Sequence, residues 1–312
     1  MAKKKQKPTS SAKRVPYCNR RSECNVAEVS AELQALQRQR AWVIKSRIMI
    51  ANRLQATVAG TLGYSSGLKE ADRLKLFKEA TGIIKGVIDG EQHPLRSIIL
   101  TTNIAVDGYD TQQDIFEKEM LALVKTLPVA SWVAEPNQAG FGLMSLAVII
   151  GETGDLNNYP NPAKVWKRLG CAPFTKGEET LMGASWKSRA GNKKGLQKLT
   201  AEDWTNFGYP PRRRSVSYII GENLIKQNGS GIYRSRWLEA KIRARQTHPE
   251  WEWKPCDKCK GKNHAKKKCL TCGGIGEKCG HAHKHGMLLA TKLILKNLWL
   301  EWTNTPFQPY KA

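Results

Sequence analysis

The sequence predicts a mainly α-helical protein, in which a long helical coiled coil is followed by a second helical domain with a small cysteine-rich insertion. Apolar residues recur at helical spacing, glycines and prolines mark the ends of the helical stretches, and two Cys-x-x-Cys pairs lie late in the chain. We expect a disordered basic arm over residues 1–29, the coiled-coil region over 30–128 and the second domain over 129–312. The insertion is expected at about 247–282.

The composition is strongly basic. Lysine and arginine total 51 against 27 aspartates and glutamates, which gives a formal charge of +24. Such an excess repels itself in a compact fold unless a polyanion neutralises it, so nucleic acid is the leading expected partner. No run of 18 apolar residues indicates a membrane span, and the basic N-terminus lacks the apolar core of a signal peptide. We expect a cytoplasmic protein with no membrane partner.

Residues 1–29 are polar and basic, and their composition is typical of a disordered arm that follows phosphates or merely adds solubility. A long helix is predicted from Ser30, as N-cap, to about Leu62. A second helix is predicted over Lys69–Ile88, and a third helical region over Pro94–Leu127. Long helices with short connections favour an antiparallel hairpin or coiled coil, and their apolar stripes serve core packing, dimerisation or both.

The segment Ala139–Pro173 follows this region. The apolar run Leu143–Ile150 predicts one helix, and Asn161 followed by Pro162 predicts the cap and first turn of another, which ends near Gly170. Two short helices around a glycine turn can offer backbone amides and basic side chains to a phosphate chain. The same pattern is also compatible with simple core packing.

A glycine-rich stretch over Phe174–Gly195 predicts a loop. It contains one aromatic side chain among cations, a combination that can stack on a base and hold phosphates, or that can be a solvated loop with the ring packed inward. The candidate RNA-binding residues there are Trp186, Lys187, Arg189, Lys193 and Lys194.

Three adjacent arginines, Arg212, Arg213 and Arg214, precede a predicted apolar helix over Val216–Ile225. Positive charges at a helix start are unfavourable for the helix dipole, so a phosphate partner is a reason for their presence. A further basic helix is predicted over Ser230–Gln246. Its candidate RNA contacts are Arg234 and Arg236.

The cysteine cluster is the strongest local signal. Two Cys-x-x-Cys pairs at zinc-knuckle spacing predict a closed structural Zn²⁺ site with four thiolate ligands, Cys256, Cys259, Cys269 and Cys272. Cys279 and His281 lie just beyond and are possible substitute ligands. Many lysines surround the pairs, so the module is expected to fold on zinc and to present cations to nucleic acid. A last helix over His281–Trp302 is expected to return to the core, which makes the module an insertion between two core helices.

An active site is not evident from the sequence. A RuvC-type nuclease needs acidic residues on strands, and an HNH nuclease needs a ββα metal hairpin with a histidine base; neither pattern is found. Ser185 and Ser188 remain candidate nucleophiles next to cations, without an identifiable base. The sequence therefore favours a protein that is not an enzyme, with serine chemistry as the alternative.

Several motifs resemble a known group of domains. Gly140-x-Gly142, the apolar run, Gly154-Asp155-Leu156 and Leu169-Gly170-Cys171-Ala172-Pro173 resemble the transposase domain of RNA-guided insertion-sequence transposases, which pair a RuvC domain with a serine. The same segment resembles the Nop domain of box C/D ribonucleoproteins, and both families place a helical coiled coil before it. The chain departs from the transposases in two ways: its N-terminus holds only the basic arm, and its serines are followed by Trp186 and Arg189 rather than by glycine.

A nuclease-free, Nop-like chain with cysteines is most similar to the Tas proteins of tandem interspaced guide RNA (TIGR) systems. This resemblance implies a guide-RNA-binding protein of an RNA-guided DNA-targeting ribonucleoprotein, without its own nuclease domain. The partners it implies are a structured guide RNA, target DNA reached through RNA pairing, and a second copy of the chain in a homodimer. The alternative is a transposase or recombinase that uses a serine nucleophile.

Overall fold

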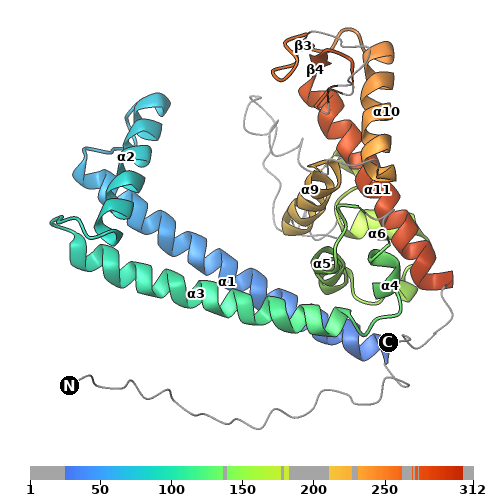
Figure 1. Cartoon of the computed structure of the whole chain (residues 1–312), viewed down its shortest axis with the longest axis horizontal. Helices are drawn as coiled ribbons and strands as arrows, with labels where there is room; N and C mark the ends of the chain where they lie inside the picture. The colour runs from blue at the N-terminus through green and yellow to red at the C-terminus, as the bar shows by residue number, and fades with distance from the viewer. Residues whose placement is uncertain are drawn as a thin grey trace, which may run out of the picture.

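The computed structural model describes residues 25–135, 139–176, 179–182, 211–226, 231–261, 269, 271–272 and 274–304. Helices dominate this part of the chain, which confirms the predicted mainly α-helical class (Figure 1). Two long helices form an arm that extends from a more compact helical body. None of the described helices is both long enough and apolar enough to cross a bilayer.

The arm consists of α1 (Val26–Thr61) and α3 (Arg96–Val124), which run antiparallel to each other (Figure 1). Arg40 of α1 forms an ion pair with Glu117 of α3 at 2.7 Å, and Arg47 pairs with Asp110 farther along the arm. α2 (Glu70–Ile88) covers the far end, where a small separate core includes Val58, Ala80, Val87 and Ile99. The predicted antiparallel hairpin is therefore present, with α2 at its tip.

The start of α1 differs from the prediction. Asn25, not Ser30, is the N-cap: its side chain accepts a hydrogen bond from the Ala27 amide at 3.1 Å and donates one to Glu28 at 2.9 Å. Ser30 lies inside the helix and is 2% exposed. Val26 and Val29 pack against the main core, and this contact extends the helix toward the N-terminus. Residues 26–29 therefore belong to α1 and not to the disordered basic segment that was predicted over 1–29.

The compact body is built from shorter helices around one hydrophobic core that also includes Leu33 and Met120 from the two arm helices. Its elements are α4 (Ala130–Val133), α5 (Leu143–Thr153), the 3-10 helix η2 (Leu156–Asn158), α6 (Pro162–Arg168), α9 (Pro211–Lys226), α10 (Ile232–Thr247) and α11 (Gly280–Asn304). α11 contacts α6, α9 and α10. The prediction that the last helix returns to the core is confirmed.

The segment Ala139–Pro173, called the central segment from here on, has the predicted local structure. The Asn161 side chain accepts from the Lys164 amide at 3.3 Å, and Pro162 occupies the first turn of α6. α5 ends at Gly154, whose φ of +79° lies in the region that favours glycine. These two helices and their connecting turn follow directly from local residue preferences.

Three tryptophans attach the central segment to α11. The Trp166 indole donates to the Lys292 carbonyl at 3.0 Å, and the Trp299 indole donates to the Tyr159 carbonyl at 3.0 Å. The Trp302 indole donates to the Asp155 carboxylate at 2.9 Å. Each ring thus contributes apolar area and also satisfies its N–H, as buried indoles require.

Part of the predicted loop over Phe174–Gly195 is a β-hairpin. β1 (Pro173–Lys176) pairs antiparallel with β2 (Glu179–Met182), with Phe174 opposite Leu181. The loop prediction is wrong for these residues, because Phe174, Thr175 and Thr180 are residue types that favour strands. The described chain has a second short pair, β3 (Lys254–Pro255) with β4 (Glu277–Lys278).

Candidate metal centre and nucleic-acid interface

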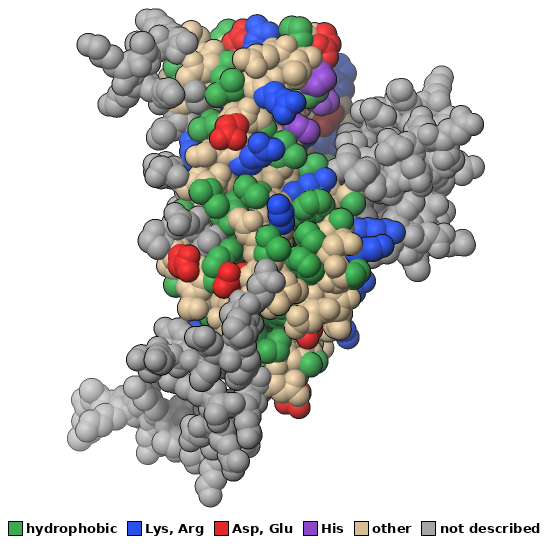
Figure 2. Space-filling view, turned by 90° about the vertical axis from the view of Figure 1, so that its right-hand side faces the viewer, with side chains coloured by type: hydrophobic (Ala, Val, Ile, Leu, Met, Phe, Trp, Pro, Cys, Tyr) green, Lys and Arg blue, Asp and Glu red, His purple; other side chains and the backbone are tan. Residues whose placement is uncertain are grey.

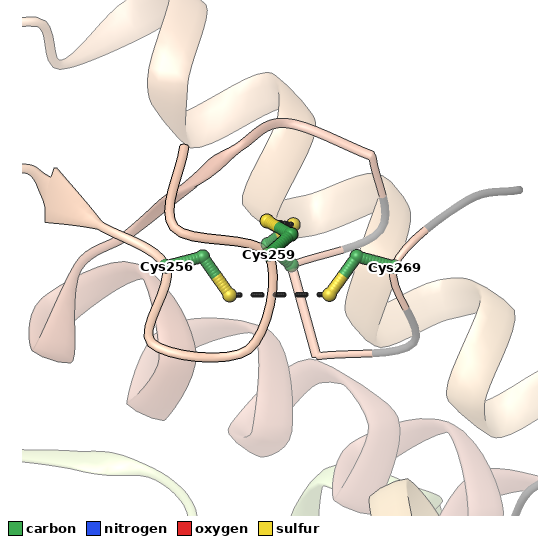
Figure 3. Close-up of side chains that lie close together, drawn as sticks. Cys256, Cys259 and Cys269 are labelled. Atoms are coloured by element: carbon green, nitrogen blue, oxygen red, sulfur yellow. Dashed lines mark hydrogen bonds between the residues drawn. The ribbon is translucent and has the colours of Figure 1, made fainter. Parts of the chain in front are cut away.

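The four predicted cysteine ligands converge in the loop between α10 and α11 (Figure 3). The Sγ atoms of Cys256 and Cys269 are 3.9 Å apart, those of Cys259 and Cys272 are 3.7 Å apart, and all four lie within 4.8 Å of one another. A tetrahedral site with metal–sulfur distances of about 2.3 Å separates its sulfurs by about 3.8 Å. The four thiols therefore have the spacing that a tetrahedral metal ion needs.

The backbone around the thiols is shaped to support them. The Cys256 amide donates to the Gly276 carbonyl at 2.8 Å and continues the pairing of β3 with β4. The Gly276 amide donates to the Cys272 sulfur at 3.3 Å. Lys260 and Gly261 both have positive φ, of 49° and 77°, so the chain turns tightly after Cys259. These features are typical of a knuckle in which backbone amides stabilise thiolates.

One of the thiols favours the thiolate near neutral pH. Burial raises the pKa of Cys269, but hydrogen bonds from the backbone of Cys272 and Thr271 outweigh burial and lower this pKa to about 6. The pKa of Cys259 is raised to about 12, by burial and by hydrogen bonds with Cys272 and Cys256. A bound cation would favour the loss of the protons that remain on these thiols, as in a structural metal site.

Lys241 is a site residue that the sequence analysis missed. Its ammonium group donates to the Thr271 carbonyl in the metal-binding loop at 2.9 Å and lies 4.3 Å from the ring centre of Trp237. The side chain is 2% exposed. Burial is the largest effect on the Lys241 pKa and lowers it, and the nearby Cys272, Cys256 and Cys269 oppose this shift only in part. Nothing in the local sequence distinguishes this lysine from its exposed neighbours on α10.

The two possible substitute ligands lie outside the four-cysteine group. Cys279 is buried in a small apolar cluster with Ala244 and Ala282. His281 packs against Trp251, with ring centres 5.7 Å apart. Four thiols already complete a tetrahedral set, so neither residue is needed as a ligand.

The three predicted phosphate-binding arginines have partners inside the fold. Arg212 contacts both oxygens of the Glu152 carboxylate, at 2.8 and 3.0 Å, and Arg213 contacts one of them at 3.2 Å. Arg214 donates to the Gly170 carbonyl at 2.9 Å. Glu152 resolves the unfavourable arrangement of cations at the start of α9, because its negative charge lies beside them. Their role in binding RNA stays a prediction.

The two predicted arginines of α10 differ in exposure. Arg234 is 7% exposed and donates to the Ile225 carbonyl at the end of α9. Arg236 is exposed, with a loose ion pair to Glu239 at 3.5 Å. Arg236 can therefore reach a ligand in solution, whereas Arg234 lies within the contact between α9 and α10.

A basic and aromatic surface runs along α10, α11 and the loop that joins them. Figure 2 shows this side of the molecule, where lysines and arginines lie among hydrophobic side chains and histidines gather toward the upper end. His248 stacks on Trp251 with ring centres 4.2 Å apart. We call this surface the α10–α11 face; it comprises Arg236, His248, Trp251, His281, His285 and Lys292.

Charges on the α10–α11 face repel one another. The pKa of His285 is lowered by burial and, in addition, by His248, Lys292 and Arg236. An anion bound among these groups would relieve the repulsion. Glu250 pairs with His248 at 3.0 Å and Glu239 pairs with Arg236 at 3.5 Å, so carboxylates offset part of the charge on this face.

The remaining predicted RNA contacts, Trp186, Lys187, Arg189, Lys193 and Lys194, lie outside the described residues, as do the candidate nucleophiles Ser185 and Ser188. No protein-family model matches the sequence, and no curated protein or solved structure is significantly similar to it.

Proposed function

We propose that the chain is a guide-RNA-binding protein of an RNA-guided DNA-targeting ribonucleoprotein, without a nuclease domain of its own. The observation that supports it most is the α10–α11 face, where cations and stacked rings lie together beside the metal module. Cations bind phosphates of any nucleic acid, and exposed rings stack on unpaired bases, a combination that suits a structured RNA with loops. The resemblance to Nop-like and Tas proteins supplies the guide role, and base pairing would select the DNA.

The proposed cofactor is one structural Zn²⁺ held by Cys256, Cys259, Cys269 and Cys272. Sulfur spacings of 3.7 and 3.9 Å and the amide bond to Cys272 support this assignment. Zinc would supply a fixed cross-link between the two Cys-x-x-Cys pairs of this loop. The expected content is one zinc per chain, and a clearly lower content in freshly purified protein contradicts the assignment.

The arm of α1 and α3 is proposed to be a coiled coil that mediates a homodimer, and the body is proposed to be Nop-like. Apolar side chains on the arm support the dimer: Trp42 is 57% exposed, Ile104 is 72% exposed and Ile115 is 49% exposed. Exposed rings and isoleucines on a long helix pair are typical of an interface with a second copy. The resemblance to Tas proteins implies a chain encoded by a prokaryote or a phage, so the particle would act in the cytoplasm of a prokaryotic cell.

Sequencing the RNA that co-purifies with the protein, expressed from its native locus, tests the proposal. We expect one discrete length class of RNA, and a large reduction of it in the double variant Arg236→Ala/Lys292→Ala. The matched control is Arg38→Ala/Lys45→Ala, which removes two exposed cations from α1. Absence of RNA, or RNA of random length and origin, contradicts a guide role.

A DNA-cleavage assay distinguishes the proposed function from the alternative, a transposase or recombinase that uses a serine nucleophile. The ribonucleoprotein is incubated with matched supercoiled DNA and a divalent cation, and no strand cleavage is expected. Cleavage that disappears in Ser185→Ala or Ser188→Ala would instead support the transposase or recombinase function.

A further inference from the structure

Two arginines of α9 bind one buried carboxylate, and a third arginine, from α6, lies beside one of them. Glu152, at the end of α5, is 1% exposed and accepts bonds from Arg212 and Arg213. Its other partner is Gln37 of α1, whose amide donates to it at 2.9 Å. Arg168, at the end of α6, lies close enough to Arg213 that its positive charge helps burial to lower the pKa of Arg213.

The positive charge of this group exceeds the negative charge. Arg168, Arg212 and Arg213 contribute three positive charges, and Glu152 contributes one negative charge. Among the described residues, the Nε atom of Arg168 is buried and has no hydrogen-bond partner, and Arg168 also lies beside the hydroxyl of Tyr159. Glu152 offsets one of these three positive charges, and an additional anion would offset more of the charge at the positive end of α9.

We infer that Arg168, Arg212 and Arg213 form a binding site for a single phosphate group of a nucleic-acid backbone, with Glu152 as the positioning residue. The inference rests on the proposed nucleic-acid function and adds to it a located contact. A guanidinium group has five N–H donors, and the bonds to Glu152 use only some of them. Arg212 is 43% exposed, so a phosphate can approach the group from solvent.

A phosphodiester group fits this site. A phosphodiester oxygen pair matches the planar fork of arginine, and its charge is delocalised over oxygens that several guanidinium groups can share. Glu152 holds two of the arginines in place before binding, so little side-chain freedom is lost when the phosphate arrives. Gln37 ties the carboxylate to α1, which places the site where the arm meets the body.

The test measures binding of a labelled single-stranded RNA to nucleic-acid-free protein over a series of salt concentrations. Arg168→Gln and Arg212→Gln are each expected to weaken binding about tenfold and to reduce the salt slope by about 0.7, the loss of one phosphate contact. Arg168→Lys, which keeps the charge and loses the fork, should fall between. Arg38→Gln on α1 is the matched control and should bind like the original protein.

A second experiment measures thermal unfolding with and without inorganic phosphate. Phosphate should raise the melting temperature of the original protein and of Arg38→Gln, and it should raise that of Arg168→Gln less. If the two glutamine variants melt normally and keep the original affinity and salt slope, the site is refuted. If the original protein binds no RNA at any salt, the proposed function fails, and stabilisation by phosphate alone would then identify a site for the free anion.

Discussion

Lys241 lies between an aromatic ring and the metal-binding loop, and both contacts depend on its positive charge. Four thiolates would leave two net negative charges inside a small loop once they hold one Zn²⁺, the ion proposed for this site. A buried ammonium group near three of the sulfurs offsets part of that charge. Lys241 is thus a positioning residue for the metal module as well as a contact between the module and α10.

Lys241→Met is expected to lower zinc affinity by about tenfold, because it removes the compensating charge and the bond to the Thr271 carbonyl. Competition with a chromophoric chelator at neutral pH measures the change. Arg243→Met, at an exposed position of the same helix, is the control. Equal zinc affinity of the two variants would show that Lys241 does not act on the metal.

Glu152→Gln is expected to reduce the free energy of unfolding by about 3 kcal/mol, because two arginines lose their buried carboxylate while the shape of the side chain is kept. Urea denaturation followed by circular dichroism measures the loss. The control is Glu119→Gln, an exposed position on α3 that should change stability little. A loss no larger than that of the control would contradict a central role for the ion pairs.

At the scale of elements, glycines allow three helix pairs to approach closely. A Cβ atom at Gly151 of α5 would lie 2.5 Å from the Gln37 Cβ atom of α1, and one at Gly221 of α9 would lie 2.6 Å from the Thr291 hydroxyl of α11. At Gly286 of α11 it would lie 2.9 Å from the Trp237 ring. The body therefore depends on backbone proximity at each of these crossings.

Gly151→Ala is expected to destabilise the protein by about 1–3 kcal/mol, because the added methyl group meets the α1 side chain and backbone. Gly82→Ala is the matched control: Gly82 is in α2, nothing lies within 4 Å of an added Cβ, and alanine favours the helix by about 0.5–1 kcal/mol. Thermal unfolding of the two variants should shift in opposite directions. A shift of Gly151→Ala in the same direction as Gly82→Ala would refute the close crossing.

Local patterns predicted most helices, because capping residues, glycines and apolar spacing act within a few positions, as at Asn161 and Gly170. The four metal ligands were predictable for the same reason. The partners of the arginines were not, because Glu152 is 60 residues away from Arg212 in the sequence and meets it only in the folded chain. Lys241 was missed because burial, and not residue type, separates it from the other lysines.

At the scale of the whole molecule, the metal module is the loop between α10 and α11 that carries the four cysteines. It lies at one end of the α10–α11 pair, far from the arm (Figure 1). Chelation should therefore loosen residues 254–279 and leave α1 and α3 intact. Hydrogen exchange before and after chelation is the measurement, with faster exchange expected in the module and unchanged exchange in the middle of α1. Global unfolding on chelation, or no change in the module, would contradict this arrangement.

The proposed dimer also belongs to this scale. The antiparallel register that pairs Arg40 with Glu117 places Trp42 level with Ile115 on the arm. Trp42→Asp/Ile115→Asp is expected to convert a dimer into a monomer, as measured by light scattering after gel filtration. Leu74→Asp, at an exposed position of α2, should leave the mass unchanged. A monomeric original protein would refute the dimer directly.

The position of α11 affects how the chain folds during its synthesis. α11 covers α6, α9 and α10, yet it is translated roughly 110 residues after α6 ends. At about 5–20 residues per second, the ribosome needs roughly 6–22 seconds for that distance. Until then Leu156, Val165 and Leu169 lack α11 as a cover. The nascent chain should therefore bind chaperones strongly in this interval and release them once α11 has emerged.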